Sequence, residues 1–197
     1  GRLVLAPNCG FHGLNKIKSL KGVTLAKGCT FANMLNFNVL EDVDIPDGCQ
    51  FKTMASLNQI KNVNIGNNCL IDGAFAFDNP QNVTVGNNCC ITGAHNLCSL
   101  VFFKTGSNFV LRGASRLVHA FGSEFGEGSH LYDLSDKVRF TRCVFGSNAQ
   151  VHGQLKANLN HCIIKSGAII HGCDELGLED VISCELGSDV ILDGFLP

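Results

Sequence analysis

Five side chains suited to chemistry recur at intervals of about twenty residues along the second half of the chain: Arg112, Tyr132, His152, His171 and Asp193. If each repeat formed one coil of a stacked β structure, these side chains would lie about 5 Å apart in one column. His152 and His171 could then share a metal ion with Asp193. Alternatively, Arg112 and Tyr132 could line a ligand groove, or the column could be the solvated face of a strand.

We select Arg112, Tyr132, His152 and His171 as the candidate binding residues. No catalytic residue, metal ligand or cofactor is assigned, because no second carboxylate cluster or cysteine joins the group. The acidic residues are scattered, and no G-x-S-x-G, P-loop, H-E-x-x-H or Rossmann motif occurs. The sequence leaves catalysis open and favours a non-catalytic role.

The eleven cysteines are an odd number and include no C-x-x-C pair, which argues against zinc fingers, thioredoxin-like motifs and a disulfide framework. Five of them follow one another at intervals of twenty: Cys9, Cys29, Cys49, Cys69 and Cys89. Buried free cysteine behaves as a small hydrophobic residue, so we predict a packing role for this ladder. A reducing cytosol is the expected compartment.

Charge and hydropathy exclude several partners. The net charge of −2 offers no basic field for phosphates, so neither nucleic acid nor an anionic membrane is an expected ligand. No apolar run reaches the roughly eighteen residues that a membrane span requires. Only 16% of the residues are charged, and 22 are glycine, a composition typical of a turn-rich β protein.

The chemistry-bearing residues belong to a repeat that runs through the whole chain. Residues 21–40, 41–60, 61–80 and 81–100 align without gaps on the frame V-x-I-x-x-N/G-C-x-I-x-G. Continued in both directions, this frame predicts one all-β domain over 1–197, a right-handed parallel β-helix or solenoid of about ten coils. The frame begins within a strand at Leu3 and ends at Pro197 without a polar capping segment, so we expect a fragment of a larger protein.

Within each coil, the segments V-x-I and C-x-I alternate between apolar and variable positions, which indicates two short strands with one buried face. Ile65 should therefore point inward and Asn64 outward. Gly and Asn between the strands predict tight corners. The third side has apolar residues about three apart, which predicts arc-like or 3₁₀ turns. These residues are Leu14, Ile17, Leu20, Met34, Phe37 and Leu40.

Stacking the coils predicts three inward ladders. The first continues the five cysteines with Phe109, Ser129 and Ala149. The second is Phe11, Phe31, Phe51, Ile71, Ile91, Leu111, Leu131, Val151, Ile170 and Leu192. The third is Val23, Val43, Val63 and Val83, ending in Cys143, Cys162 and Cys184. Of the outward columns, Leu70, Cys90 and Val110 are apolar and predict a contact surface.

The segment Ile60-x-x-Val63-x-Ile65-x-x-Asn68 resembles the opening of a leucine-rich repeat. Likewise, Leu40-x-x-Val43-x-Ile45-Pro46 is similar to the repeats of bacterial surface-antigen-type leucine-rich-repeat proteins. This resemblance covers the central third of the chain and implies a protein-recognition solenoid. A three-sided β-helix explains the double alternation better, and a leucine-rich-repeat horseshoe is the alternative.

These patterns predict a protein-interaction or scaffolding solenoid with a protein partner. By analogy, it could be a domain of a bacterial effector, which would place it in the cytosol of a host cell rather than its own. A carbohydrate-binding or polysaccharide-cleaving β-helix is the first alternative, although the chain has no Trp and only one Tyr. A self-assembling structural protein, associating through its coil ends into homo-oligomers, is the second.

Overall fold

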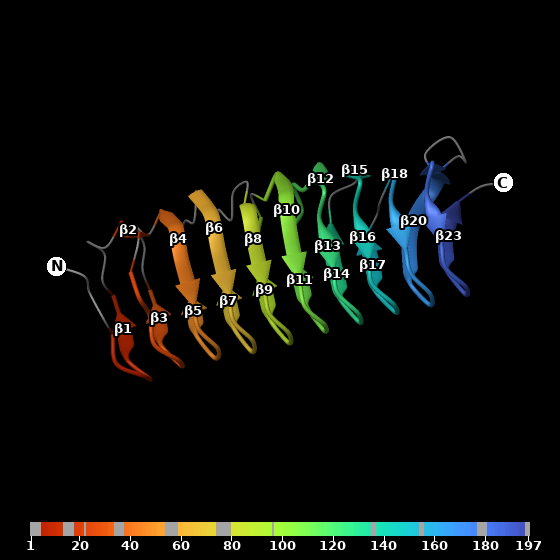
Figure 1. The fold of residues 1–197 in the computed structure, drawn as a ribbon. Coiled ribbons are helices and arrows are strands. Elements are labelled where there is room, and N and C mark those ends of the chain that lie inside the picture. The colour runs from red at the N-terminus through yellow and green to blue at the C-terminus, as the bar shows by residue number, and fades with distance from the viewer. Residues whose placement is uncertain are drawn as a thin grey trace.

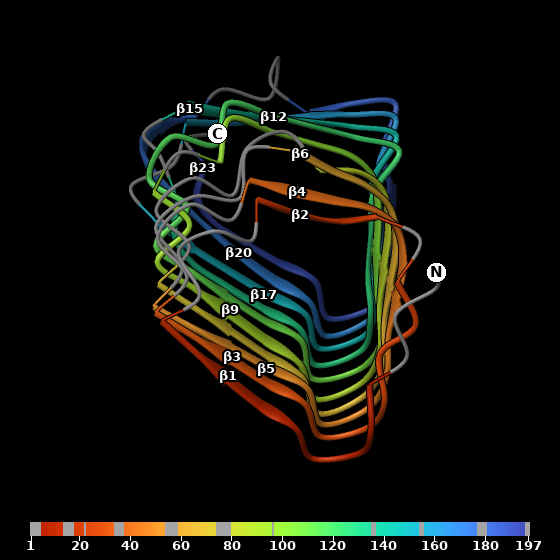
Figure 2. The ribbon, with the colours of Figure 1, turned by 90° about the vertical axis from the view of Figure 1, so that its left-hand side faces the viewer.

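The computed structural model describes residues 5–13, 18–21, 23–33, 38–53, 59–73, 80–95, 97–134, 137–153, 156–176 and 181–195. Throughout these ranges the chain forms parallel strands and turns, stacked coil upon coil into a straight solenoid (Figure 1). Viewed from the N-terminal end, the chain turns clockwise as it recedes, so the solenoid is right-handed (Figure 2). No helix long and apolar enough to cross a membrane occurs in the described part of the chain.

One side of the solenoid, which we name face A, is a ten-stranded parallel sheet. Its strands are β1 (Gly10–His12), β3 (Thr30–Ala32), β5 (Gln50–Lys52), β7 (Leu70–Asp72), β9 (Cys90–Thr92), β11 (Val110–Arg112), β14 (His130–Leu134), β17 (Gln150–Gly153), β20 (Ile169–Leu176) and β23 (Ile191–Phe195). Neighbouring coils pair at intervals near twenty residues, so each outward position of a strand lies beside its counterpart in the next coil.

A second, thirteen-stranded sheet bends around a corner and forms the other two strand-bearing sides, face B before the corner and face C after it. Four strands reach the corner or cross it: β4 (Val39–Ile45), β6 (Gln59–Ile65), β8 (Gln81–Val85) and β10 (Ser99–Thr105). Face B also contains β2 (Ser19–Lys21), β12 (His119–Phe121), β15 (Lys137–Thr141), β18 (Lys156–Asn160) and β21 (Val181–Ile182). Face C also contains β13 (Glu124–Phe125), β16 (Val144–Phe145), β19 (Ile163–Ile164) and β22 (Glu185–Leu186).

Left-handed backbone conformations mark the corners of each coil. Asn68 and Gly73, with φ of 56° and 73°, flank face A at the two corners that the Gly and Asn pattern predicts. A third corner, between faces B and C, has positive φ at Asp42, Asn62 and Asn82. Asn and Asp tolerate this conformation better than other side chains do, so their recurrence at this position has a local cause.

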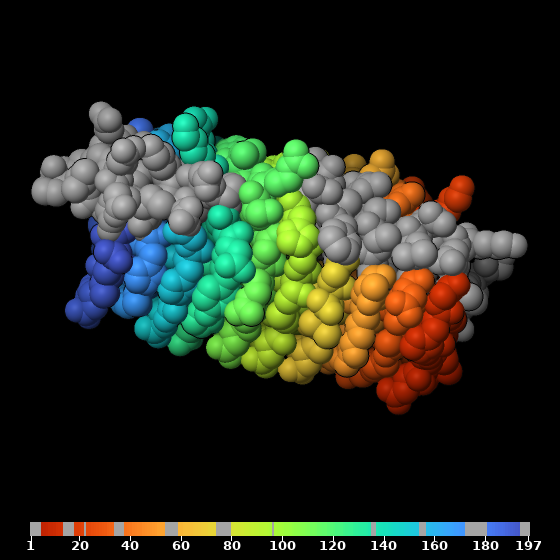
Figure 3. All heavy atoms as spheres, turned by 180° about the vertical axis from the view of Figure 1, so that it is seen from behind, coloured from red at the N-terminus to blue at the C-terminus, as the bar shows by residue number. Residues whose placement is uncertain are grey.

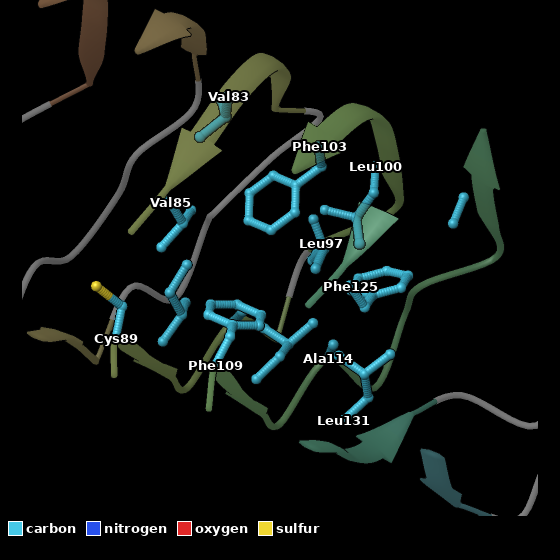
Figure 4. Packing of buried hydrophobic residues seen from close by; sticks show 14 of the residues in the cluster. Val83, Val85, Cys89, Leu97, Leu100, Phe103, Phe109, Ala114, Phe125 and Leu131 are labelled. Atoms are coloured by element: carbon cyan, nitrogen blue, oxygen red, sulfur yellow. The ribbon is translucent and has the colours of Figure 1, made fainter. Parts of the chain in front are cut away.

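The inward ladders form one continuous hydrophobic core, and the predicted inward assignment is confirmed. Phe11, Phe31 and Phe51 stack with ring centroids 5.1 and 4.9 Å apart. Farther along the solenoid, side chains from all the strand-bearing sides converge on the interior, as Leu100 of face B, Phe103 of face C and Leu131 of face A do in Figure 4. Each coil therefore completes its core only by packing on its neighbours.

The prediction of arc-like or 3₁₀ turns on the third side is confirmed in part: the backbone N–H groups of Leu97 and Leu117 donate to the carbonyls of Ala94 and Ala114, three residues earlier, but Leu20 and Leu40 do not follow it. Leu20 and Leu40 lie in strands β2 and β4, and both are buried. Pairing with the next coil satisfies their backbone groups and favours an extended conformation over a 3₁₀ turn. Leu14, Ile17, Met34 and Phe37 lie outside the described residues. The described strands pair from coil to coil on three sides, faces A, B and C. This arrangement corresponds to the three-sided β-helix rather than to the leucine-rich-repeat horseshoe.

Candidate functional site on face A

The four predicted binding residues form one continuous stack on the outward surface of face A. The guanidinium carbon of Arg112 lies 5.1 Å from the Tyr132 ring centroid. The Tyr132 and His152 centroids are 5.1 Å apart with an interplanar angle of 11°. The His152 and His171 centroids are 4.6 Å apart at 20°. The stack ends at Asp193, whose Oδ2 lies 3.0 Å from Nδ1 of His171.

The parallel sheet itself generates this stack. Arg112 pairs directly with Tyr132, and His171 with Asp193, because both pairs occupy equivalent positions of adjacent strands. Adjacent strands lie about 4.8 Å apart, which is close to the stacking distance of planar side chains. We refer to Arg112, Tyr132, His152 and His171 as the ring column.

A second outward column holds the rings in place. The Tyr132 hydroxyl is hydrogen-bonded to Nδ1 of His130 at 2.9 Å. Nε2 of His152 is 3.0 Å from Oε1 of Gln150. Both partners lie two residues earlier in the same strands, β14 and β17, and so point to the same face. Sequence reasoning missed His130 and Gln150, although their spacing of two from Tyr132 and His152 was a signal.

His152, at the centre of the column, favours the uncharged state. Partial burial, followed by the nearby His171 and His130, lowers the pKa of His152 from its usual 6.5. An imidazolium here would lose hydration and lie against another imidazole. Arg112 supplies a permanent positive charge at one end of the ring column, and its side chain is exposed to solvent.

The alternative of a shared metal ion does not fit this geometry. His152 and His171 stack face to face, so their nitrogen lone pairs, which lie in the ring planes, do not converge on one point. One nitrogen of each ring already contacts Gln150 or Asp193. Among the described residues, no three His, Cys, Asp or Glu side chains are grouped as metal ligands.

The surface around the ring column is corrugated rather than deeply hollowed. Seen from behind, the lower half of the solenoid shows parallel ridges, one for each coil (Figure 3). Because Tyr132 is covered by Arg112 on one side and His152 on the other, its ring face is closed to a ligand. The ring column therefore offers ring edges, hydrogen-bonding nitrogens and a guanidinium to a partner that lies across the ridges.

The predicted apolar column on the same face is less exposed than expected. Leu70, Cys90 and Val110 pair in register but are each half-buried by their neighbours. Phe102 and Val118, which the sequence did not single out, are more exposed than these three residues. For Phe102 a signal existed, because it occupies the corner position of Asn82 in the preceding coil.

The cysteine ladder packs in the interior and satisfies backbone carbonyls. The Cys69 and Cys89 thiols donate to the carbonyls of Pro46 and Gly66, at 3.3 and 3.0 Å. Ser129 occupies the equivalent position of a later coil and donates to the Gly106 carbonyl. Burial raises the pKa of Cys49. The ten cysteines whose side chains are described are all free thiols, and the hydrogen bonds of Cys69 and Cys89 within the ladder indicate a structural role.

Comparisons with protein-family models, with curated proteins and with solved structures found no match.

Proposed function

We propose that this chain is a non-catalytic recognition solenoid that binds a protein partner through the ring column on face A. The observation that supports this function is the unbroken stack from Arg112 to His171, ordered by the sheet and exposed along its edge. Arg and Tyr are enriched among the residues that dominate protein–protein binding energy. Because stacking already restricts these side chains, a partner would lose little conformational entropy in ordering them.

The described outward columns favour recognition over carbohydrate chemistry. Sugar binding commonly uses an open aromatic face, and the Tyr132 face is covered on both sides. The resemblance to leucine-rich repeats, although it concerns only part of the chain, also supports protein recognition. The free thiols are consistent with a reducing cytosol, which we propose as the compartment.

A variant in which Arg112, Tyr132, His152 and His171 are all replaced by Ala tests this proposal. Cation–π and stacking contacts contribute about 0.5–1.5 kcal/mol each, so the variant should lose a few kcal/mol of stability yet keep its circular dichroism spectrum. Affinity capture with the wild-type chain should recover proteins that the variant does not. The matched control is Lys52→Ala, which changes a residue in an earlier strand of face A. If the variant and the control recover the same proteins as the wild type, the ring column is not the binding surface.

A further inference from the structure

A second cluster of exposed rings lies on another side of the solenoid, at the corner between faces B and C. Phe102 is 49% exposed, and its ring contacts Phe121 edge to face with centroids 5.7 Å apart. Arg142 places its guanidinium carbon 5.9 Å from the Phe121 centroid. His119 and Arg139 are paired on the adjoining strands β12 and β15. We name these five residues the corner patch.

Phe102 has an unfavourable backbone conformation for its residue type. Its φ is 50°, a left-handed value that is unfavourable for a non-glycine residue because Cβ approaches the following carbonyl oxygen. The same corner position holds Asn82 in the preceding coil and Gly122 in the following one. Asn or Gly at this position would relieve the strain, and strain that a fold retains occurs preferentially at functional sites. The patch therefore maintains an exposed ring at an energetic cost.

The following coil provides the space for this ring. A Cβ atom at Gly122 would lie 2.8 Å from two carbons of the Phe102 ring, so only glycine allows the ring to lie there. Val118, which precedes β12 on face B, is 57% exposed and adds apolar surface beside the patch. Exposed rings and an aliphatic side chain on neighbouring coils form a surface suited to burial against a partner.

The charge of the corner patch is positive. Two of its five residues are arginines, and none is acidic. Burial, together with the charge of Arg139, lowers the pKa of His119, which is consistent with a local positive potential. The carboxylate of Glu124, on the adjoining face C, lies 2.7 Å from the Lys104 ammonium and is thereby compensated. Guanidinium groups beside apolar rings complement carboxylates that alternate with apolar side chains.

We propose that the corner patch is a docking site for an acidic, extended segment of a partner protein that alternates carboxylate and apolar side chains. The apolar side chains would cover Phe102, and the carboxylates would pair with Arg139 and Arg142. Nucleic acid fits less well, because the Phe121 face is covered by Arg142 and the Phe102 ring lies against Gly122. Base stacking requires open ring faces, and two arginines neutralise few phosphates.

Binding of a fluorescein-labelled peptide of alternating Glu and Leu, measured by fluorescence anisotropy, tests the docking site. Equivalent positions of other coils supply suitable substitutions: Phe102→Asn introduces the residue of position 82, and Arg142→Ser that of position 183. Both native residues at those positions have φ near 50°, so the fold should persist, and Phe102→Asn also removes strain. Each substitution should weaken peptide binding about tenfold or more.

Three comparisons complete the experiment. Lys61→Gln, which introduces the residue paired with Lys61 in the next coil, removes a distant charge and should leave the affinity unchanged. The four-Ala variant of the ring column should also retain it, which separates this proposal from the proposed function. Absence of peptide binding by the wild-type chain, or equal affinity of Phe102→Asn, would overturn the docking site. Variant-sensitive binding of oligothymidylate without binding of the peptide would instead identify nucleic acid as the ligand and refute the proposal.

Discussion

Replacement of Ile65 by Asp tests whether the ladders hold the solenoid together. Ile65 is 5% exposed in strand β6 and pairs with Ile45 and Val85 of the neighbouring coils. Removing its side chain from the core forfeits about 1.5–3 kcal/mol of burial. An unpaired carboxylate or carboxylic acid at the same place costs several kcal/mol more. The sum, about 5 kcal/mol, is comparable to the total stability of many domains.

Two substitutions taken from the next coil calibrate this effect. Ile65→Val introduces the residue of position 85 and should cost about 1 kcal/mol. Asn64→Thr introduces the residue of position 84 on the outward face and should change stability by about 0.5 kcal/mol or less. Asn64→Asp, which the alternation alone would suggest as a silent change, is unsuitable. Asn64 donates to an Asp44 carboxylate oxygen at 2.8 Å, and the substitution would oppose two carboxylates.

Urea unfolding followed by circular dichroism measures these differences. We expect the urea concentration at the midpoint of unfolding to fall slightly for Ile65→Val and severely for Ile65→Asp. The slope of the unfolding free energy against urea concentration should be smaller for Ile65→Asp if the coils around position 65 unfold separately from the rest. The Asn64→Thr midpoint should remain that of the wild type. Equal midpoints for Ile65→Asp and Asn64→Thr would refute the assignment of inward and outward positions.

Three further predictions concern the thiols, the ring column and the corner. Native-state labelling with a thiol reagent should spare the buried Cys49, whose pKa is raised by burial, and rapid modification there would contradict its packing role. In an NMR titration, His152 should have a pKa below 6.5, and His171→Asn should raise it. Since the folded-state pKa is lowered, the stability that His152 contributes is complete above pH 6.5 and declines as the pH falls below that value. A His152 pKa at or above 6.5 in the NMR titration would contradict this account. Gly122→Ala should lower stability by about 1–2 kcal/mol through its positive φ and the contact with Phe102, and adding Phe102→Asn should recover part of the loss in a thermal melt.

The interval of twenty residues was sufficient to predict the ladders, because stacking in register places equivalent positions side by side. A slip of one residue would move Val63 and Ile65 to the outward face and Asn64 into the core, so the apolar alternation determines the orientation of the strand. The ring column followed from the same interval. Its members had to lie about one strand spacing apart once the coils were stacked.

Other features depend on interactions that the repeat pattern does not contain. The corner at Asp42 falls within a stretch of alternating polarity, and only the recurrence of Asn or Asp there indicated a left-handed residue. Whether His152 and His171 stack or converge on a ligand depends on their side-chain torsions, which hydrogen bonds to Gln150 and Asp193 decide. The exposure of Phe102 depends on Gly122 in another coil.

The corner column shows how a solenoid of this kind gains a binding surface without losing its fold. In the earlier coils, Asp42, Asn62 and Asn82 occupy this corner and hydrogen-bond to one another through their side chains, so their polar groups are largely used within the column. This polar ladder ends at the ring of Phe102, and the next two positions of the corner hold Gly122 and Arg142. Because each coil contacts only its neighbours, such a change costs stability locally and leaves the remaining ladders intact. In this corner column, the side chains that follow Asn82 are therefore the ones that remain open to a partner.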